Sequence, residues 1–297
     1  MLEHVWNRKV ARLPDEGVML VCTDLQGNLG DFERMVALYR EAAAEGPAVL
    51  AFCGDLVHGP SPELLEPGAW PRHLGTPYAD ESAELLRRFE ALCREEAMFS
   101  VLGNHEHAHI GGPRVPKFYP DEAAVLNRAL GSDRERLCDF LRTFPLVAVA
   151  PCGVVLTHAS PRVTAPSIEA FEALEWAGYE HVHVLEMAYR DALGALLWAR
   201  GCSDPDAQAL LKVVTGEAIG VVVHGHDVVR AGFAREGRHH MVLSTSFALM
   251  DERKTYLRVD LGGKYSSTAD LREGVELCAL YPEAAQLPEM APSAGTG

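Results

Sequence analysis

Five short polar motifs, spread over most of the sequence, contain the residue types that bind divalent metal ions. Their central residues are Asp24, Asp55, Asn104, His158 and His226. Carboxylate, amide and imidazole donors together suit borderline divalent ions such as manganese, iron or zinc. A carboxylate shared by two ions would hold them roughly 3.5–4 Å apart, the arrangement that is used for phosphoester hydrolysis. The five residues therefore predict a two-metal hydrolytic centre if the fold brings them together.

Short apolar runs rich in β-branched residues precede these motifs and predict strands buried on both faces. The runs lie at residues 18–22, 48–53, 98–102, 147–149, 154–157 and 221–223. Apolar residues at three- and four-residue spacing predict helices at residues 31–45, 80–96, 134–143, 168–177 and 184–198. Alternating strands and helices indicate a layered α/β fold. Ligands of open α/β sheets bind beyond the carboxyl ends of the strands, so the five motifs should meet at one edge.

The remaining segments set the expected domain organisation. Two further strands are predicted at residues 241–247 and 255–261, joined by a hairpin turn at residues 251–254. Residues 59–80 contain five prolines and three glycines, which indicates a long surface loop. Residues 281–297 lack periodicity and are predicted to form a disordered tail. We therefore expect a single domain over residues 1–280, with residues 59–80 as a Pro-rich insertion.

The motifs resemble those of the calcineurin-like metallophosphoesterases and, within that superfamily, those of bacterial serine/threonine phosphoprotein phosphatases. The family has five motifs, which are, in order, D-x-H-G, G-D-x-x-D-R-G, G-N-H-E, H-G-G and G-H. The corresponding segments of this chain occur in the same order and are D-L-Q-G at residues 24–27, G-D-L-V-H-G at 54–59, G-N-H-E at 103–106, T-H-A-S-P at 157–161 and G-H-D at 225–227. An L-L-W segment at residues 196–198 is similar to one that precedes the final histidine in the family. The resemblance implies a layered sandwich of central mixed β-sheets flanked by helices, with the metal site at the strand carboxyl ends.

The resemblance also implies a role for each motif residue. Asp24 and the residue at position 26, here Gln26, would bind the first metal, and Asp55 would bridge both metals. The ligands of the second metal would be Asn104, His158 and His226. His105 would face the substrate and protonate the leaving alcohol, while the metals activate water and screen the phosphoryl charge. Manganese is the expected ion at both positions, with iron or zinc as alternatives.

The sequence departs from the family pattern at two places that affect chemistry. Gln26 replaces a histidine, and an amide oxygen is a harder and weaker donor than an imidazole nitrogen, so the first site should bind weakly and favour manganese or magnesium. His58-Gly59-Pro60 replaces D-R-G, which leaves His105 without its usual carboxylate partner and the phosphate without its usual arginine. Arg162 and Arg200 are candidates to bind the phosphate. His224 is a candidate for an extra ligand or a supporting group, and a purely structural role is an equal alternative.

Three functions are compatible with these residues. The first is a phosphomonoesterase that acts on phosphoserine or phosphothreonine in proteins. The second is a hydrolase for a small nucleotide such as a dinucleoside polyphosphate. The third is a phosphate-binding or scaffold protein whose catalytic centre has decayed at Gln26 and at residues 58–60. The Pro-rich insertion is interpreted either as a substrate-selecting lid or rim or as a solvent-exposed insertion.

The composition of the chain restricts the kinds of partner that it is expected to bind. The 297 residues carry a formal net charge of −15 and no cluster of Lys and Arg, which argues against a nucleic-acid scaffold as the partner. No run of eighteen apolar residues and no signal-peptide pattern occur, so no membrane association and a cytoplasmic location are expected. The seven cysteines are scattered without a C-x-x-C pair, which argues against a disulfide framework. The expected partner is a phosphorylated protein or a small phosphoester, and the sequence leaves the oligomeric state open.

Overall fold

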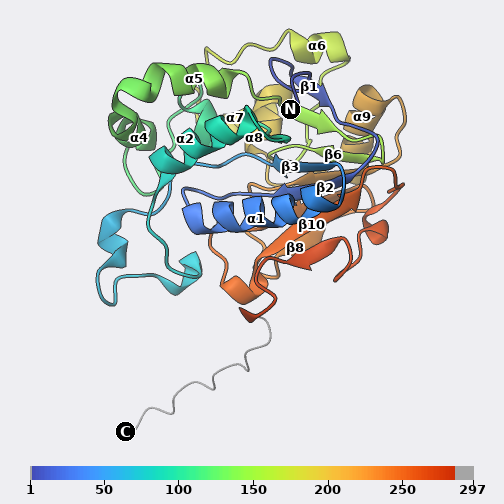
Figure 1. Cartoon of the computed structure of the whole chain (residues 1–297). Helices are drawn as coiled ribbons and strands as arrows, with labels where there is room; N and C mark the ends of the chain where they lie inside the picture. Colours follow the sequence, from blue (N-terminus) through green and yellow to red (C-terminus); the bar gives the residue numbers. More distant parts are fainter. Residues whose placement is uncertain (1, 285–297) are drawn as a thin grey trace, which may run out of the picture.

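Two mixed β-sheets packed face to face form the centre of the protein in a computed structural model, which describes residues 2–284 (Figure 1). One sheet has the order β11-β10-β2-β3-β4, with strands Leu277–Ala279, Thr255–Asp260, Val18–Cys22, Ala48–Phe52 and Met98–Ser100. The other has the order β1-β5-β6-β7-β9-β8, with strands Val10–Arg12, Val147–Val149, Val154–Leu156, Val221–His224, His240–Leu243 and Phe233–Arg235. The predicted α/β class, with mixed sheets flanked by helices, is confirmed.

Both faces of the central strands are buried, which explains their continuous apolar composition. Strands β2 and β3 pair in parallel with Val21 opposite Ala51, and these two side chains lie in the core between the sheets. Their neighbours Leu20 and Leu50 face the opposite way and pack under the helices. Burial of alternate residues in two different cores fixes the strand register, because a slip by one residue would exchange the two faces.

Helices cover the outer faces of the sheets (Figure 1). They are α1 Leu29–Glu45, α2 Ser82–Cys93, α3 Asn104–His107, α4 Glu122–Leu130, α5 Arg134–Arg142, α6 Ile168–Glu172, α7 Val184–Arg190, α8 Ala192–Trp198 and α9 Asp204–Thr215. The side chain of Asn28 accepts a hydrogen bond from the backbone N–H of Asp31 and so caps the start of α1. Phe32 of α1 and Phe89 of α2 both pack against Phe52 of β3. These aromatic contacts hold α1 and α2 on the sheet whose strands lead into the first three motifs.

Several predicted elements differ from the observed ones. The predicted hairpin of residues 241–261 is wrong, because β9 pairs with β7 and β8 in one sheet while β10 pairs with β2 and β11 in the other. The predicted helix over residues 184–198 is two helices, α7 and α8, separated by Asp191. Asp191 has an extended backbone, with φ −160° and ψ −179°, and its side chain caps α8 by accepting from the N–H of Gly194. The helix predicted at residues 168–177 ends at Glu172.

Segments without a predicted element are also informative. Strands β1, β8 and β11 and helices α3, α4 and α9 were not predicted, and α4 matters for the site described below. The Pro-rich segment 59–80 contains only two short 3-10 helices, Pro62–Leu65 and Arg72–Leu74. Of the predicted tail, residues 285–297 lie outside the described part, and the hydroxyl of Tyr281 donates to Asp31 Oδ1 at 2.7 Å. Among residues 2–284, no helix combines the length and the apolar composition that crossing a bilayer requires.

Candidate metal centre

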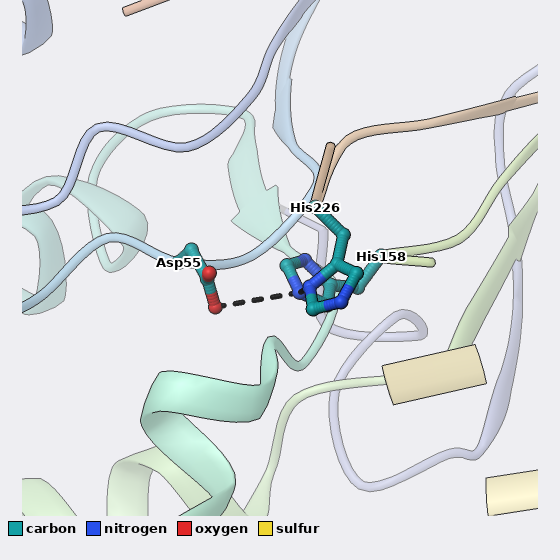
Figure 2. Close-up of side chains that lie close together, drawn as sticks. All are labelled: Asp55, His158 and His226. Carbon is teal, nitrogen blue, oxygen red and sulfur yellow. Dashed lines mark hydrogen bonds and ion pairs between the residues drawn. The ribbon is translucent and has the colours of Figure 1, made fainter. Parts of the chain in front are cut away.

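Four potential metal-binding atoms, three from loops and one from the first residue of α3, converge at one end of the sandwich. The Nε2 atom of His158 lies 3.4 Å from Asp55 Oδ1, 2.8 Å from Asn104 Oδ1 and 3.1 Å from His226 Nδ1. The distance from His226 Nδ1 to Asn104 Oδ1 is also 3.1 Å. Figure 2 shows Asp55, His158 and His226 pointing toward one another. These segments follow β3, β4, β6 and β7, so the predicted convergence at the strand carboxyl ends occurs for these four residues.

The imidazole of His158 is held in the tautomer that a metal needs. Its Nδ1 lies 2.7 Å from the carbonyl oxygen of Cys53, so Nδ1 carries the proton and donates it to that oxygen. The Nε2 lone pair is therefore directed at Asp55, Asn104 and His226. A backbone acceptor on the second ring nitrogen is the usual support of a metal-binding histidine. The arrangement of these donors fits a divalent ion.

Burial at this centre disfavours charged side chains when no cation is bound. Burial raises the pKa of Asp24 and of Asp55, and the neighbouring Asp55 carboxylate raises the pKa of Asp24 further. Burial also lowers the pKa of His158 and His226. A divalent ion would reverse the effect on the carboxylates, because its positive charge favours their ionised forms. Neutral imidazole is already the form that binds a metal.

The loops that carry these residues adopt backbone conformations that non-glycine residues rarely take. Asp24, Asp55 and His226 have φ values of 52°, 53° and 68°, in the left-handed region. Such conformations cost on the order of 1–3 kcal/mol each and persist where the surroundings impose them, often at functional sites. At Asp24 the backbone is held on both sides, because its N–H donates to the carbonyl oxygen of Gly54 at 3.3 Å and its carbonyl oxygen accepts from the N–H of Phe247 at 2.9 Å. The carboxylate accepts a hydrogen bond from the N–H of His226, at 3.1 and 3.2 Å to its two oxygens.

Glu106 holds the second and third motifs together. It is fully buried, and its carboxylate accepts hydrogen bonds from the N–H groups of Gly103 at 3.0 Å, Asp55 at 2.8 Å and Leu56 at 2.8 Å. Burial raises the pKa of Glu106, and the nearby Asp55 adds to this effect. Glu106 is the last residue of the G-N-H-E motif and was not predicted to have a role. Its position three residues after Gly103 is the signal, because an N3 glutamate can reach back to backbone donors at a helix start.

His105 lies between the metal centre and a second polar cluster. Its Nε2 is 3.7 Å from Asp55 Oδ2, and its backbone N–H donates to Asp55 Oδ1 at 3.1 Å. Its Nδ1 is 3.0 Å from His58 Nδ1 and 3.5 Å from Glu122 Oε2. Glu122 thus places a carboxylate on the Nδ1 side of His105, where the motif residues supply none, although Glu122 Oε2 makes no hydrogen bond within the described residues. It begins α4, whose start is marked by Asp121, an N-cap that accepts from the N–H of Ala124.

The predicted ligands of the first metal have partners within the protein. Gln26 Oε1 accepts a hydrogen bond from Lys117 Nζ at 2.6 Å. Lys117 was not predicted, and it belongs to the segment between α3 and α4, which contains no motif. Burial lowers the pKa of Lys117 to about 8, and the nearby carboxylates of Asp55 and Asp24 oppose this shift. Within residues 2–284 the groups around Asp24 and Gln26 therefore do not form a free ligand set like the one around His158.

The other predicted residues take different positions. Both ring nitrogens of His224 face protein groups, with Nε2 3.3 Å from Ser160 Oγ and Nδ1 3.1 Å from the Gly225 carbonyl oxygen, outside the converging donors. The Nε of Arg162 donates to the carbonyl oxygen of Gly201 at 2.8 Å, and its guanidinium lies over the ring of Tyr189. Arg200 pairs with Asp227 and is near enough to Asp55 to oppose the rise of that carboxyl's pKa.

Comparison with known proteins agrees with this geometry. Residues 18–230 match the family model described as calcineurin-like phosphoesterase, which is more than half of the chain. The chain belongs to the calcineurin-like phosphoesterase family. It is therefore a metal-dependent phosphoester hydrolase. The family depends on a dinuclear metal centre, and the described residues contain two clusters that could hold an ion, Asp55-His158-His226 and His58-His105-Glu122.

Solved structures share the fold of this calcineurin-like phosphoesterase at low identity. A protein serine/threonine phosphatase from Saccharomyces cerevisiae is 14% identical, with a TM-score of 0.50, and the alignment covers 86% of this chain and 77% of that one. A cold-active protein-tyrosine phosphatase of a Shewanella species is 12% identical, with a TM-score of 0.51 and coverage of 86% and 79%. No curated protein sequence matches the chain. At these identities the structures support the fold, and the substrate has to be argued from the site.

Glu106→Gln should loosen the centre. The new amide group would place N–H donors against the N–H groups that Glu106 now accepts from, leaving buried donors unpaired at a cost of about 1–3 kcal/mol. Urea unfolding should show this loss, and elemental analysis should show reduced metal retention. Glu95→Gln, at an exposed glutamate of the same charge, is the matched control. Equal stability of Glu106→Gln and native protein would mean that the carboxylate does not hold the loops as described.

Gln26→His should increase metal binding at the first position. The substitution removes the oxygen that Lys117 contacts and adds a nitrogen donor, which suits zinc and iron better than a neutral oxygen does. Metal content by elemental analysis should rise, and activity titrations should shift in preference from manganese toward zinc. Lys117→Met alone serves as the control for loss of the ammonium contact. Unchanged metal content and preference in Gln26→His would show that position 26 does not limit the first site.

Proposed function

We propose that this protein is a phosphomonoesterase that removes phosphate from phosphoserine or phosphothreonine in proteins. The observation that supports this proposal most directly is the placement of His105. One ring nitrogen faces Asp55 of the metal centre, and the other faces the buried carboxylate of Glu122. An imidazole supported in this way is suited to donate a proton beside the position where a bound phosphate would react.

The need for a proton distinguishes the substrate classes. The alkoxide of serine or threonine is a strongly basic leaving group, so its departure requires protonation. A phosphate leaving from a phosphoric anhydride is a far weaker base and depends much less on an acid. An oriented acid at His105 therefore favours an alcohol phosphomonoester over a dinucleoside polyphosphate, the alternative substrate class.

Asp55, Asn104, His158 and His226 would hold the metal ion, and manganese is the ion we propose. When bound, it would lower the pKa of water and screen the charge on the phosphoryl oxygens. The residues of the chain then have separate tasks. Asp55 also fixes His105 through the backbone N–H, and Arg200 is the arginine that we propose to contact the phosphate, because it is the predicted arginine that acts electrostatically on Asp55.

We propose further that the Pro-rich insertion forms a fixed rim that selects substrates. The hydroxyl of Tyr78 donates to the backbone carbonyl oxygen of Gln26 at 3.1 Å, beside the centre. Leu74 packs with Phe247, and Trp70 and Tyr78 join this apolar cluster. A segment held by these contacts is more consistent with a rim than with a lid that opens and closes.

A substrate series tests the proposed function. With manganese, the native protein should hydrolyse p-nitrophenyl phosphate and a phosphoserine peptide much faster than bis-p-nitrophenyl phosphate or a dinucleoside tetraphosphate. Asp55→Asn should abolish this activity and lower the metal content, because an amide cannot supply the negative charge that binds the ion. Asp139→Asn, at an exposed position, is the control.

Two other outcomes of this substrate series would favour the two alternative functions. Hydrolysis of the dinucleoside tetraphosphate faster than that of the phosphoserine peptide would favour a nucleotide hydrolase. Absence of hydrolysis of every substrate at high metal concentration would favour the phosphate-binding protein with a decayed centre.

His105→Ala should slow the reaction according to the leaving group. Hydrolysis of the phosphoserine peptide should fall by about 10²–10⁴-fold, the usual contribution of general-acid catalysis. Hydrolysis of p-nitrophenyl phosphate should fall much less, because p-nitrophenolate leaves without protonation. Manganese content, measured by elemental analysis, should stay at the native level. Loss of the ion in this variant would instead make His105 a ligand of the catalytic metal.

A further inference from the structure

A second set of converging donors lies behind the metal centre, on the side of His105 that faces away from Asp55. The Nδ1 atoms of His58 and His105 are 3.0 Å apart, and they lie 3.4 and 3.5 Å from Glu122 Oε2. The three side chains are 1%, 5% and 2% exposed. Within the described residues, Glu122 Oε2 is buried without a hydrogen-bond partner. A buried carboxylate oxygen with no donor, beside two imidazole nitrogens, is a place where a cation would be stabilised.

Two of the three donor spacings, 3.4 and 3.5 Å, match those of zinc ligands, and the third, 3.0 Å between the two imidazole nitrogens, is somewhat shorter. Tetrahedral zinc binds nitrogen and oxygen donors at about 2.0–2.2 Å, so neighbouring donors lie roughly 3.3–3.5 Å apart. The three atoms therefore form one face of a coordination tetrahedron and leave the fourth position open. Two imidazoles and one carboxylate are also a common zinc ligand set.

A series of hydrogen bonds through His109 directs the lone pair of His58 Nδ1 toward His105 and Glu122. His109 Nδ1 lies 3.0 Å from Asn127 Oδ1, which can only accept, so this nitrogen carries a proton and His109 Nε2 has a lone pair. His58 Nε2 lies 2.8 Å from His109 Nε2 and donates to it. His58 Nδ1 is then the unprotonated nitrogen and faces His105 and Glu122. The tautomer that a metal requires is thus fixed from outside the set.

We propose that His58, His105 and Glu122 form a regulatory zinc site whose occupancy inhibits the enzyme. The inhibitory effect rests on the proposed role of His105 as the general acid, whereas zinc binding itself does not. Zinc would bind His105 Nδ1 and displace the proton held there, which is released to solvent. The remaining N–H at Nε2 of a neutral, zinc-bound imidazole is a weaker acid than that of an imidazolium ion. The site shares no donor atom with the set around His158.

Substrates with different leaving groups distinguish inhibition at this zinc site from displacement of the catalytic metal by zinc. In manganese-loaded enzyme, added zinc should inhibit hydrolysis of the phosphoserine peptide at least about tenfold more than hydrolysis of p-nitrophenyl phosphate, because the second reaction does not need the acid. Elemental analysis should show one additional zinc per chain with manganese retained. X-ray absorption at the zinc edge should show a mixed nitrogen and oxygen environment.

Substitutions locate the ion. Glu122→Gln should raise the zinc concentration for half-inhibition and weaken zinc binding, each by at least about tenfold, because it removes the anionic donor. His58→Gln should do the same, and it keeps the proposal testable if Glu122→Gln does not fold, as checked by circular dichroism. His107→Gln is the matched control, because His107 is buried nearby but bonds to the carbonyl oxygen of Trp176 outside the set. It should retain native zinc sensitivity.

Two results would overturn the site. The first is that zinc only replaces manganese, with no additional ion bound. The second is that zinc binds equally well to native protein and to folded Glu122→Gln and His58→Gln variants. If the native protein hydrolyses no phosphoester, the proposed function fails, yet zinc binding by native and variant chains still decides whether this site exists.

Discussion

The buried carboxylate of Glu106 is the contact on which the geometry of the centre depends. By accepting N–H groups from Gly103, Asp55 and Leu56, it joins the loop after β3 to the loop after β4. The two loops touch so closely that a Cβ atom on Gly103 would lie 2.3 Å from the backbone nitrogen of Asp55. A side chain at position 103 would therefore force apart the loops that carry Asp55 and Asn104.

The second requirement is the packing of one sheet on the other. Asp55 and Asn104 come from the sheet that contains β2, β3 and β4, whereas His158 and His226 come from the sheet that contains β6 and β7. Contacts between the sheets join the two halves, since His158 Nδ1 donates to the Cys53 carbonyl oxygen and the N–H of His226 donates to Asp24. Metal binding is thus coupled to the apolar core between the sheets, which sets how the strand ends align.

The central strands and the polar residues that follow them could be predicted from the sequence, because local apolar patterns and short motifs encode them. It could not predict Glu122 or Lys117, because each belongs to no motif and reaches the site only through the path of the chain between α3 and α4. The β9–β10 hairpin failed for a related reason: a turn between two strand patterns says nothing about whether both strands join the same sheet. The separation of α7 from α8 at Asp191 is the opposite case. There the apolar pattern continues from one helix into the next, but the side chain of Asp191 caps α8 and so starts a new helix.

The departure from the family motif at residue 58 changes the chemistry available to His105. The family normally supplies a carboxylate there, and in this chain Glu122 supplies one from α4 instead. Moving the carboxylate to another element leaves position 58 free for an imidazole, so His105 has two partners where one would suffice to orient it. A single carboxylate can hold only a proton on His105 Nδ1, whereas a carboxylate and a correctly tautomerised imidazole together can also hold a metal ion. The same rearrangement that would orient His105 as the proposed acid would therefore also form the proposed inhibitory zinc site.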